Sequence, residues 1–321
     1  EKMHARVLET VSQSSPLRRK IFWWAVDVGR RHGEYRLQGA RPPALLDLKY
    51  KLATVLAFKK LYNRVGGRLR FFISGGAPLS REIAEFFWAA GITILEGYGL
   101  TETSPVISVN RPERIRFGTV GPPLPGVKVK IADDGEILTQ GPNVMKGYYR
   151  DEAATKEAID PDGWFRTGDV GVLDSEGFLA VIDRKKDLIV TAGGKNIAPQ
   201  PIENRLKTNP YILEIVLVGN RRRFTSALVV PDFERLGEWA RAQGIQAIGN
   251  KELAESTKVV EFIQQQIDEM TSDLAQFEKI KKVCLVEKEF SLERGELTPT
   301  LKVKRNVIES RYKELIDGMY T

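Results

Sequence analysis

Two glycine-rich segments carry side chains that could bind a phosphorylated ligand: Ser74-Gly75-Gly76-Ala77-Pro78 and Gly97-Tyr98-Gly99-Leu100-Thr101-Glu102. Because glycine has no Cβ, a ligand can approach the main chain closely in both segments. In the second segment, Tyr98 offers an aromatic face to a planar base, Thr101 a hydroxyl to a phosphate, and Glu102 a hard oxygen to Mg²⁺. Glycine mostly marks turns, so a purely structural role is the alternative interpretation.

Three further clusters place charge at predicted turns. Residues 164–169 put the carboxylate of Asp169 on a tight turn, where it could accept hydrogen bonds from ribose hydroxyls. Residues 183–187 contain three consecutive cations, which suit a polyanion, and residues 297–305 present a turn with Lys302. Each cluster by itself is interpreted as readily as a solvated turn.

The elements that must position these residues follow from hydrophobic periodicity. Residues 1–35 are predicted to be helical with a break at Ser14-Ser15-Pro16, and residues 45–62 form a further helix. Apolar strands at residues 69–74 and 92–96 flank a helix in a unit of the length of a parallel crossover. Because the carboxyl ends of parallel strands share one sheet edge, both glycine-rich segments are predicted to be turns that meet there.

The rest of the chain is predicted to form two smaller units. Recurring glycine and proline indicate a compact β subdomain at about residues 118–183, and the chain from residue 188 onward indicates an α+β unit. The charged cluster at residues 184–187 marks the favoured boundary. The elements predicted here are strands at 127–132, 136–140, 178–183, 212–218 and 226–230 and a helix at 253–277.

Composition excludes several classes of protein. A length of 321 residues favours two domains, and no apolar run approaches the ~18 residues of a membrane-spanning helix. The single cysteine, Cys284, rules out an internal disulfide and fits a reducing compartment, so a cytoplasmic location is expected. With His4 and His32 as the two histidines, there is little room for a His-rich metal site or a Ser/His/Asp triad.

The net charge of +7 is unevenly spread along the chain. Residues 1–72 carry 16 Lys/Arg and 5 Asp/Glu, a net charge of +11. The remainder carries 33 Lys/Arg and 37 Asp/Glu, a net charge of −4. One interpretation is peripheral contact with the inner face of an anionic membrane, with Trp23 and Trp24 as interfacial anchors. Nucleic acid is another interpretation, which we do not favour, and a solvated helical face is the simplest alternative.

The order of these motifs resembles the adenylate-forming (AMP-binding) superfamily, from about Leu69 to Ile308. Within it, the chain is most similar to the long-chain fatty acid–CoA ligases. That assignment depends on the basic Trp-containing segment, on residues 183–188, and on Leu301, where luciferase and peptide-synthetase members usually carry glycine. The matching motifs are Gly97–Glu102, Gly135–Ile137 through Gly147-Tyr148, Arg166–Asp169, Arg184–Asp187, Gly193–Ile197 and Thr298–Arg305.

The resemblance implies a fold, a reaction and a set of site residues. Residues 1–185 would be the latter part of a large α/β adenylation domain, and residues 186–321 a small, mobile α+β domain. ATP and a fatty acid would form an acyl-adenylate with Mg²⁺, and coenzyme A would then displace AMP. The implied residues are Lys302, Thr101 and Glu102 for catalysis, with Glu102 also binding the metal; Gly76, Ala77, Pro78, Gly97, Tyr98, Gly99, Thr101, Asp169 and Arg184 for ATP and AMP; Lys186 as the hinge; Gly193, Gly194 and Lys195 for coenzyme A; and Gly75, Leu100, Val120 and Gly121 for the acyl pocket.

The sequence departs from the family pattern in one respect. The Ser/Thr/Gly-rich phosphate loop that ends in Pro-Lys-Gly is absent from the printed sequence, as is a G-x-x-x-x-G-K-[ST] loop. We therefore expect the C-terminal part of a longer enzyme, present as a fragment that lacks the phosphate loop. The alternatives are a non-catalytic remnant that binds nucleotide or acyl-CoA, and an adenylation domain that loads a carrier protein. A homodimer is compatible with each of them.

Overall fold

The computed structural model describes residues 2–246, 249–299 and 301–321. The chain divides into two compact units, Glu1–Ile182 and Asp183–Thr321, here named the first unit and the second unit. This division falls three residues before the predicted boundary between residues 185 and 186. No helix in the described ranges is both long enough and apolar enough to cross a bilayer.

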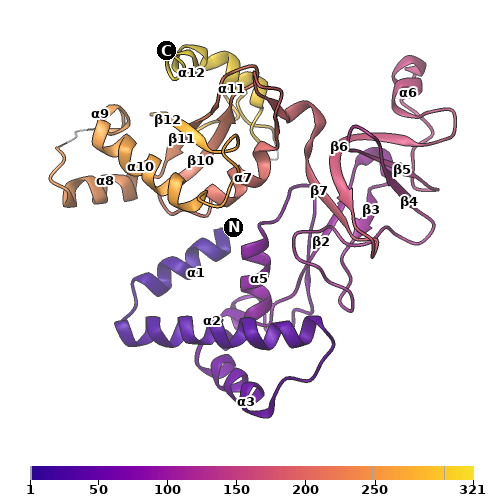
Figure 1. Ribbon diagram of the computed structural model, residues 1–321. Coiled ribbons are helices and arrows are strands. Elements are labelled where there is room, and N and C mark those ends of the chain that lie inside the picture. The colour runs from indigo at the N-terminus through magenta and orange to yellow at the C-terminus, as the bar shows by residue number, and fades with distance from the viewer. Residues whose placement is uncertain (1, 247–248, 300) are drawn as a thin grey trace. The chain divides into compact units, whose positions relative to one another are not determined.

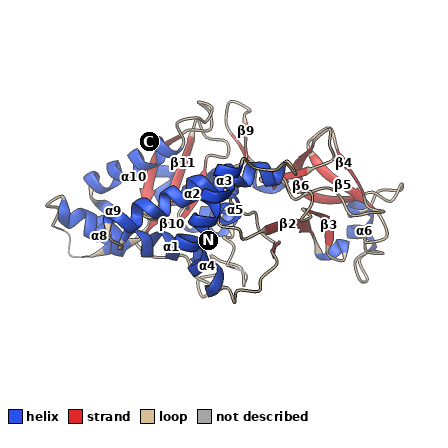
Figure 2. Ribbon diagram, turned by 90° about the horizontal axis from the view of Figure 1, so that it is seen from below, coloured by secondary structure: helices blue, strands red, loops and turns tan. Residues whose placement is uncertain are grey.

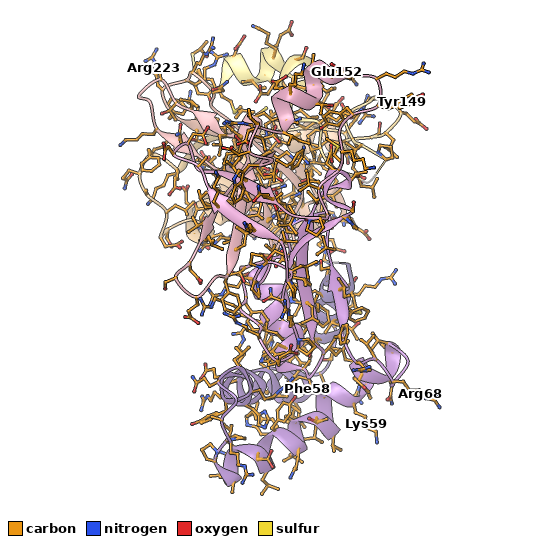
Figure 3. The ribbon with its side chains drawn as sticks, turned by 90° about the vertical axis from the view of Figure 1, so that its right-hand side faces the viewer. Phe58, Lys59, Arg68, Tyr149, Glu152 and Arg223 are labelled. Carbon is orange, nitrogen blue, oxygen red and sulfur yellow. The ribbon has the colours of Figure 1, made fainter. Side chains whose placement is uncertain are left out.

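Helices open the first unit, and the predicted break between the first two is confirmed. Pro16 begins α2, a position where its missing N–H costs no helical hydrogen bond. Helix α2 packs on α3 and α5 (Figure 1), so closely that a Cβ on Gly29 would lie 2.4 Å from the carbonyl oxygen of Ala89. Phe58 is buried between the helices, whereas the adjacent Lys59 is exposed (Figure 3). The helical elements are α1 (Lys2–Ser12), α2 (Pro16–Leu37), α3 (Ala44–Ala53), a π-helical turn (Thr54–Phe58), α4 (Lys59–Arg64) and α5 (Arg81–Ala89).

A three-stranded sheet follows, and it confirms the predicted crossover. Strand β1 (Phe72–Ser74) lies parallel to β2 (Ile94–Gly99), and α5 connects them. The prediction that Gly97-Tyr98-Gly99 forms a turn is wrong. These residues continue β2, because β3 (Val106–Val109) pairs antiparallel with them and keeps the backbone extended. The turn begins at Leu100 instead, in a 3₁₀ helix at Thr101–Thr103.

The β subdomain is a four-stranded sheet with the order β4-β5-β6-β7. Figure 2 shows β4, β5 and β6 grouped together. The tight turn predicted for residues 164–169 is also wrong, since residues 165–169 belong to β6. Phe165, Thr167 and Asp169 alternate inward as a strand requires, while Gly168 (φ +70°) bends it locally. The elements are β4 (Lys128–Ile131), β5 (Glu136–Gln140), α6 (Glu152–Ala158), β6 (Phe165–Leu173) and β7 (Leu179–Arg184).

In the second unit, a three-stranded sheet of order β10-β11-β12 lies between two layers of helices (Figure 1). Alternate residues face opposite layers: Leu217 and Val229 pack with α7–α10, and Val218 and Val230 with α11 and α12. The single helix predicted at 253–277 is wrong, because it breaks at Ser256 and ends at Met270. The elements are β8 (Ile189–Val190), β9 (Asn196–Ile197), α7 (Pro199–Leu206), β10 (Ile212–Val218), β11 (Thr225–Pro231), α8 (Phe233–Ala242), α9 (Asn250–Glu255), α10 (Thr257–Met270), β12 (Ile280–Leu285), α11 (Arg305–Arg311) and α12 (Lys313–Gly318).

Candidate functional site

A short hydrogen bond joins two of the predicted site residues in the first unit. The Tyr98 hydroxyl donates to Oδ2 of Asp169 at 2.6 Å, although 71 positions separate the two residues in the sequence. Asp169 is buried and Tyr98 is half-buried. The structure therefore brings the glycine-rich strand β2 and the predicted ribose-binding carboxylate together at one place.

Glu136 shapes the bend that presents Asp169. Its buried carboxylate accepts hydrogen bonds from the backbone N–H of Gly168 (3.1 Å) and from Nη1 of Arg166 (3.2 Å). The Thr167 hydroxyl accepts the backbone N–H of Asp169 at 3.1 Å. Glu136 stands inside a matching motif, but it was not among the predicted site residues. The feature that could have indicated Glu136 is a charged residue at the start of a strand whose other residues are mostly buried.

Glu96 links the two glycine-rich segments, and it was not among the predicted site residues. Its Oε1 accepts the backbone N–H of Leu79 at 2.9 Å, which ties the loop at residues 75–78 to β2. Burial raises the pKa of the Glu96 carboxyl to about 7, and the Leu79 hydrogen bond opposes that rise. A Cβ on Gly75 would lie 3.4 Å from the carbonyl oxygen of Gly97, so the segments are in contact as predicted.

The exposed part of this region contains the residues predicted to bind adenine. Gly76, Ala77 and Pro78 are exposed, and Gly97 and Gly99 are half-buried. A Cβ on Gly99 would lie 1.7 Å from the carbonyl oxygen of Pro105, so β2 accepts no larger residue there. This glycine has a packing role in addition to any contact with a ligand.

Thr101 and Glu102 follow on the 3₁₀ turn, which Thr103 stabilises. The buried Thr103 hydroxyl accepts the backbone N–H of Leu100 at 2.9 Å. Thr101 is exposed, and Oε1 of Glu102 accepts the Tyr148 hydroxyl at 3.2 Å. Burial and the neighbouring Glu102 carboxylate raise the pKa of Tyr148. Tyr148, like Glu136, lies in a matching motif without having been predicted as a site residue.

Glu102 offers Mg²⁺ a single protein carboxylate. The described residues contain no group of three or more His, Cys, Asp or Glu side chains that could hold a metal ion. Mg²⁺, however, is usually bound through one or two carboxylates, with substrate phosphates and water as its other ligands. A single half-buried carboxylate beside the exposed Thr101 is compatible with that arrangement.

The four predicted acyl-pocket residues have different surroundings. Val120 is buried and packs in a small core cluster with Tyr98 and Leu179. A Cβ on Gly121 (φ +80°) would lie 2.2 Å from the backbone nitrogen of Asn110, so the glycine allows its loop to approach the end of β3. Leu100 is half-buried and Gly75 is exposed beside the glycine-rich strand.

In the second unit, Lys302 lies at an exposed, internally bonded turn. The backbone N–H of Thr298 donates to the Lys302 carbonyl at 2.7 Å, and the Lys302 N–H donates to the Thr298 hydroxyl at 3.0 Å. Leu301 has φ +60°, a conformation that glycine adopts without strain. Thr300 of the same motif lies outside the described residues.

Two buried carboxylates hold the ends of the lysine turn. Glu296 is fully buried and accepts hydrogen bonds from Nε of Arg294 (2.9 Å) and from the Tyr312 hydroxyl (3.0 Å). Burial and the Glu296 partner raise the pKa of Tyr312 to about 12. On the other side, Nη2 of Arg305 donates to both carboxylate oxygens of Glu203, at 2.8 and 2.9 Å. Hydrogen bonds to buried carboxylates therefore anchor the chain on both sides of the turn.

The predicted hinge and coenzyme A residues also belong to the second unit. Arg184 and Lys186 are exposed beside Asp183, whose buried carboxylate accepts the backbone N–H of Gln200 at 2.8 Å. Burial raises the pKa of Asp183. Gly193, Gly194 and Lys195 form the exposed turn of the β8–β9 hairpin.

Comparison with known proteins identifies the class to which this fold and site belong. Residues 40–149 match the family model described as AMP-binding enzyme, and residues 186–321 match the AMP-binding enzyme C-terminal domain. The chain belongs to the AMP-binding enzyme family.

The relatives are fatty acid–CoA ligases. Long-chain-fatty-acid–CoA ligase FadD15 of Mycobacterium bovis is 40% identical over 280 residues, which cover 87% of this chain and 46% of that protein. Long-chain-fatty-acid–CoA ligase ACSBG2 of Mus musculus is 35% identical over 344 residues, which cover 100% of this chain and 51% of that protein. The chain thus spans about half the length of these relatives.

A solved structure shares the fold. The A domain of carboxylic acid reductase from Segniliparus rugosus, in complex with AMP and a co-purified carboxylic acid, superposes with a TM-score of 0.67 at 22% identity. The match covers 92% of this chain and 45% of that chain. At this identity the comparison supports the predicted α/β and α+β fold and nothing further.

Proposed function

We propose that this chain is part of a long-chain fatty acid–CoA ligase, an AMP-forming acid–thiol ligase. The observation that carries the proposal is the 2.6 Å hydrogen bond between Tyr98 and Asp169, which joins two motifs of the family at one site. The names of the relatives, at 35–40% identity, support the fatty acid as the substrate.

The nucleotide would bind in the first unit along β2. Adenine would lie against Gly76-Ala77-Pro78 and Gly97-Tyr98-Gly99, and the ribose hydroxyls would donate to Asp169. Tyr98 would hold the Asp169 carboxylate in one orientation through their hydrogen bond. Arg184 would be a further residue that binds the nucleotide. Thr101 would contact phosphate, and Glu102 would hold Mg²⁺, which when bound supplies positive charge to the phosphate oxygens.

The reaction would proceed in two displacements. A carboxylate oxygen of the fatty acid attacks the α-phosphorus of ATP, the bond to the bridging oxygen breaks, and pyrophosphate leaves. The sulfur of coenzyme A then attacks the acyl carbonyl carbon, loses its proton, and AMP leaves with the bonding electrons. The first step brings two anions together, so the cation of Lys302 would offset their repulsion and stabilise the growing charge.

The two steps would use different parts of the second unit. Lys186 would act as the hinge that exchanges the Lys302 turn for the Gly193-Gly194-Lys195 turn between the displacements. The two glycines would flank the path of the pantetheine arm, where the absence of side chains leaves a narrow opening. Gly75, Leu100, Val120 and Gly121 would line the entrance for the acyl chain.

ATP–pyrophosphate exchange tests the proposal. The chain is assayed with palmitate and, in parallel, with amino acids. Exchange that depends on palmitate supports the ligase, whereas exchange that depends on amino acids supports an adenylation domain that loads a carrier protein. Absence of exchange with measurable AMP or coenzyme A binding supports the non-catalytic remnant and contradicts catalysis by this chain.

We also propose that the first unit contacts a membrane surface from the cytoplasmic side. Leu17 and Trp23 are exposed on α2, at 68% and 50%, beside the exposed cations of residues 18–20. Trp24, predicted as a second anchor, instead packs partly buried against the helical core, so Trp23 would be the anchor.

A homodimer remains a separate prediction, which light scattering after size-exclusion chromatography checks.

A further inference from the structure

Three consecutive arginines form the turn between β10 and β11, and this turn is bonded to the β8–β9 turn. The backbone N–H of Ala192 donates to the carbonyl of Arg222 at 2.8 Å, and the N–H of Arg221 donates to the carbonyl of Val190 at 2.8 Å. The β8–β9 turn is itself closed by the N–H of Thr191, which donates to the carbonyl of Lys195 at 3.0 Å. The positions of the two turns relative to each other are therefore set by backbone bonds within one unit.

The three arginines have different surroundings. Arg222 is used in the fold, because it pairs with Asp317 and lies over the Tyr320 ring, 4.9 Å from its centroid. Arg221 and Arg223 are exposed, and the Arg223 side chain extends away from the ribbon (Figure 3). Within the described part of the chain, neither has a carboxylate partner. Their charges are thus available to a ligand.

The backbone at Arg221 provides a second observation. Its φ of +59° lies in the left-handed region, which glycine or asparagine would occupy at lower cost. Residues held in such conformations are concentrated at ligand-binding and active sites. Glycine at position 221 would remove the backbone strain. Arginine keeps the strain and places a long, charged side chain on the turn.

An open surface pocket of about 620 Å³ is lined by residues in and next to β8 and by residues of the β10–β11 turn. The described residues that line it provide one cation and no carboxylate: Leu188, Val190, Thr191, Ala192, Asn220 and Arg221. Arg223, exposed two positions further along the same turn, carries a second guanidinium. Lys195, exposed on the β8–β9 turn, is not a lining residue, and its Nζ lies 5.7 Å from the centroid of the Phe277 ring. A guanidinium presents paired donors that match a phosphate group, so this arrangement suits a ligand with several phosphates.

We propose that Arg221 and Arg223 bind the phosphates of the coenzyme A nucleotide, an inference that rests on the proposed function. Coenzyme A carries a diphosphate and a 3′-phosphate at the end opposite its thiol. The Gly193-Gly194 turn, proposed to flank the pantetheine arm, is part of the same bonded pair of turns. One surface of the second unit would therefore hold both the arm and the phosphates.

Direct binding measurements test this assignment without fatty acid or ATP. The double variant Arg221→Gln/Arg223→Gln is compared with Arg241→Gln/Lys258→Gln, which removes the same charge from exposed positions on α8 and α10. Titration calorimetry is carried out with coenzyme A, with 3′-dephospho-coenzyme A and with pantetheine. We expect Arg221→Gln/Arg223→Gln to bind coenzyme A about tenfold more weakly than the unsubstituted chain does, and to bind pantetheine with unchanged affinity.

Several outcomes would overturn the assignment. They are an undetectable affinity of the unsubstituted chain for coenzyme A, an unchanged affinity in Arg221→Gln/Arg223→Gln, and an equal loss in the control variant. Inorganic pyrophosphate that bound as tightly as coenzyme A would show a general polyphosphate site instead. A chain that fails palmitate-dependent exchange but gives the expected titrations would refute the proposed ligase activity alone, so the two failures are distinguishable.

Discussion

The Tyr98 hydroxyl lies 2.6 Å from Oδ2 of Asp169 and joins the strand that carries Gly97 and Gly99 to the strand that carries Gly168. Either residue alone would be an ordinary polar side chain. Together they form a partly buried edge at which a donor and a carboxylate are oriented before any ligand arrives. The bond thus links the fold of the β subdomain to the nucleotide site that we propose.

Removal of this hydrogen bond should weaken nucleotide binding. Tyr98→Phe keeps the ring but leaves Asp169 without the donor, and a hydrogen bond to a charged group contributes about 1.5–3 kcal/mol. We expect the Kd for AMP, measured by titration calorimetry, to rise about tenfold. Tyr149→Phe is the matched control, because that side chain is 85% exposed. An AMP affinity that Tyr98→Phe leaves unchanged would remove the basis of the proposed site.

Glu96 should make stability depend on pH in a defined window. Its folded pKa of about 7 exceeds the usual 4.5, so the folded state holds a proton that the unfolded chain has lost between these values. The free energy of unfolding should therefore fall as pH rises from about 4.5 to about 7, by up to about 3 kcal/mol. Glu96→Gln cannot ionise and should abolish this component.

Urea unfolding at pH 5 and pH 8 measures the effect of Glu96→Gln. The variant should gain stability relative to the unsubstituted chain at pH 8 more than at pH 5. Glu82→Gln on the exposed surface of α5 controls for loss of one charge. A stability difference that is the same at both pH values would contradict the inferred protonation of Glu96.

Local pattern predicted much of the architecture but not the detail of the site. The β1–α5–β2 crossover was predictable because short apolar strands and a glycine-terminated helix are local signals. Strand β6 was missed, since residues 165–173 include two glycines and an aspartate, and they form a strand through pairing with β5. The same pairing with a distant strand explains why Gly97–Gly99 is extended and not a turn.

The residues that orient the site were harder to predict than those that face the ligand. Glu96 accepts from Leu79, 17 positions away, and Glu136 accepts from Gly168, 32 positions away. No local spacing rule connects a carboxylate with a backbone N–H at such separations. Their burial is decided by how the strands pair, which the sequence of one segment does not contain.

Substitution of Lys186 tests the hinge. Proline fixes φ near −65° and disfavours helical backbone at the preceding residue, so Lys186→Pro should restrict the backbone of residues 185 and 186, which lie in the 3₁₀ turn Lys185–Asp187. In a preparation with palmitate-dependent exchange, we expect one half-reaction to persist and the other to be lost. Lys186→Ala is the control for loss of the charge. An overall rate unchanged by proline would mean that no hinge lies at this residue.

Neutralisation of residues 18–20 tests the membrane proposal. Each basic residue near an anionic surface contributes about 1 kcal/mol, so replacement of all three by glutamine should weaken vesicle binding by about two orders of magnitude. The measurement is co-sedimentation with phosphatidylserine-containing vesicles, and added salt should mimic the effect. The control replaces Lys258, Lys281 and Lys282, exposed in the second unit. Equal binding by both variants would count against contact through α2.

Lys302 is predicted to act in the first half-reaction and not the second. Lys302→Ala should retain the turn, because the bonds that close it run through the backbone of Lys302 and leave its side chain free of that role. Loss of a group that stabilises developing charge typically costs about 10²–10³ in rate. We expect that loss in palmitate-dependent pyrophosphate release, while thioester formation from supplied palmitoyl-adenylate continues. Lys304→Ala, exposed two residues later, is the matched control. An equal loss in both half-reactions would assign Lys302 to the general architecture of the site and would exclude the proposed role.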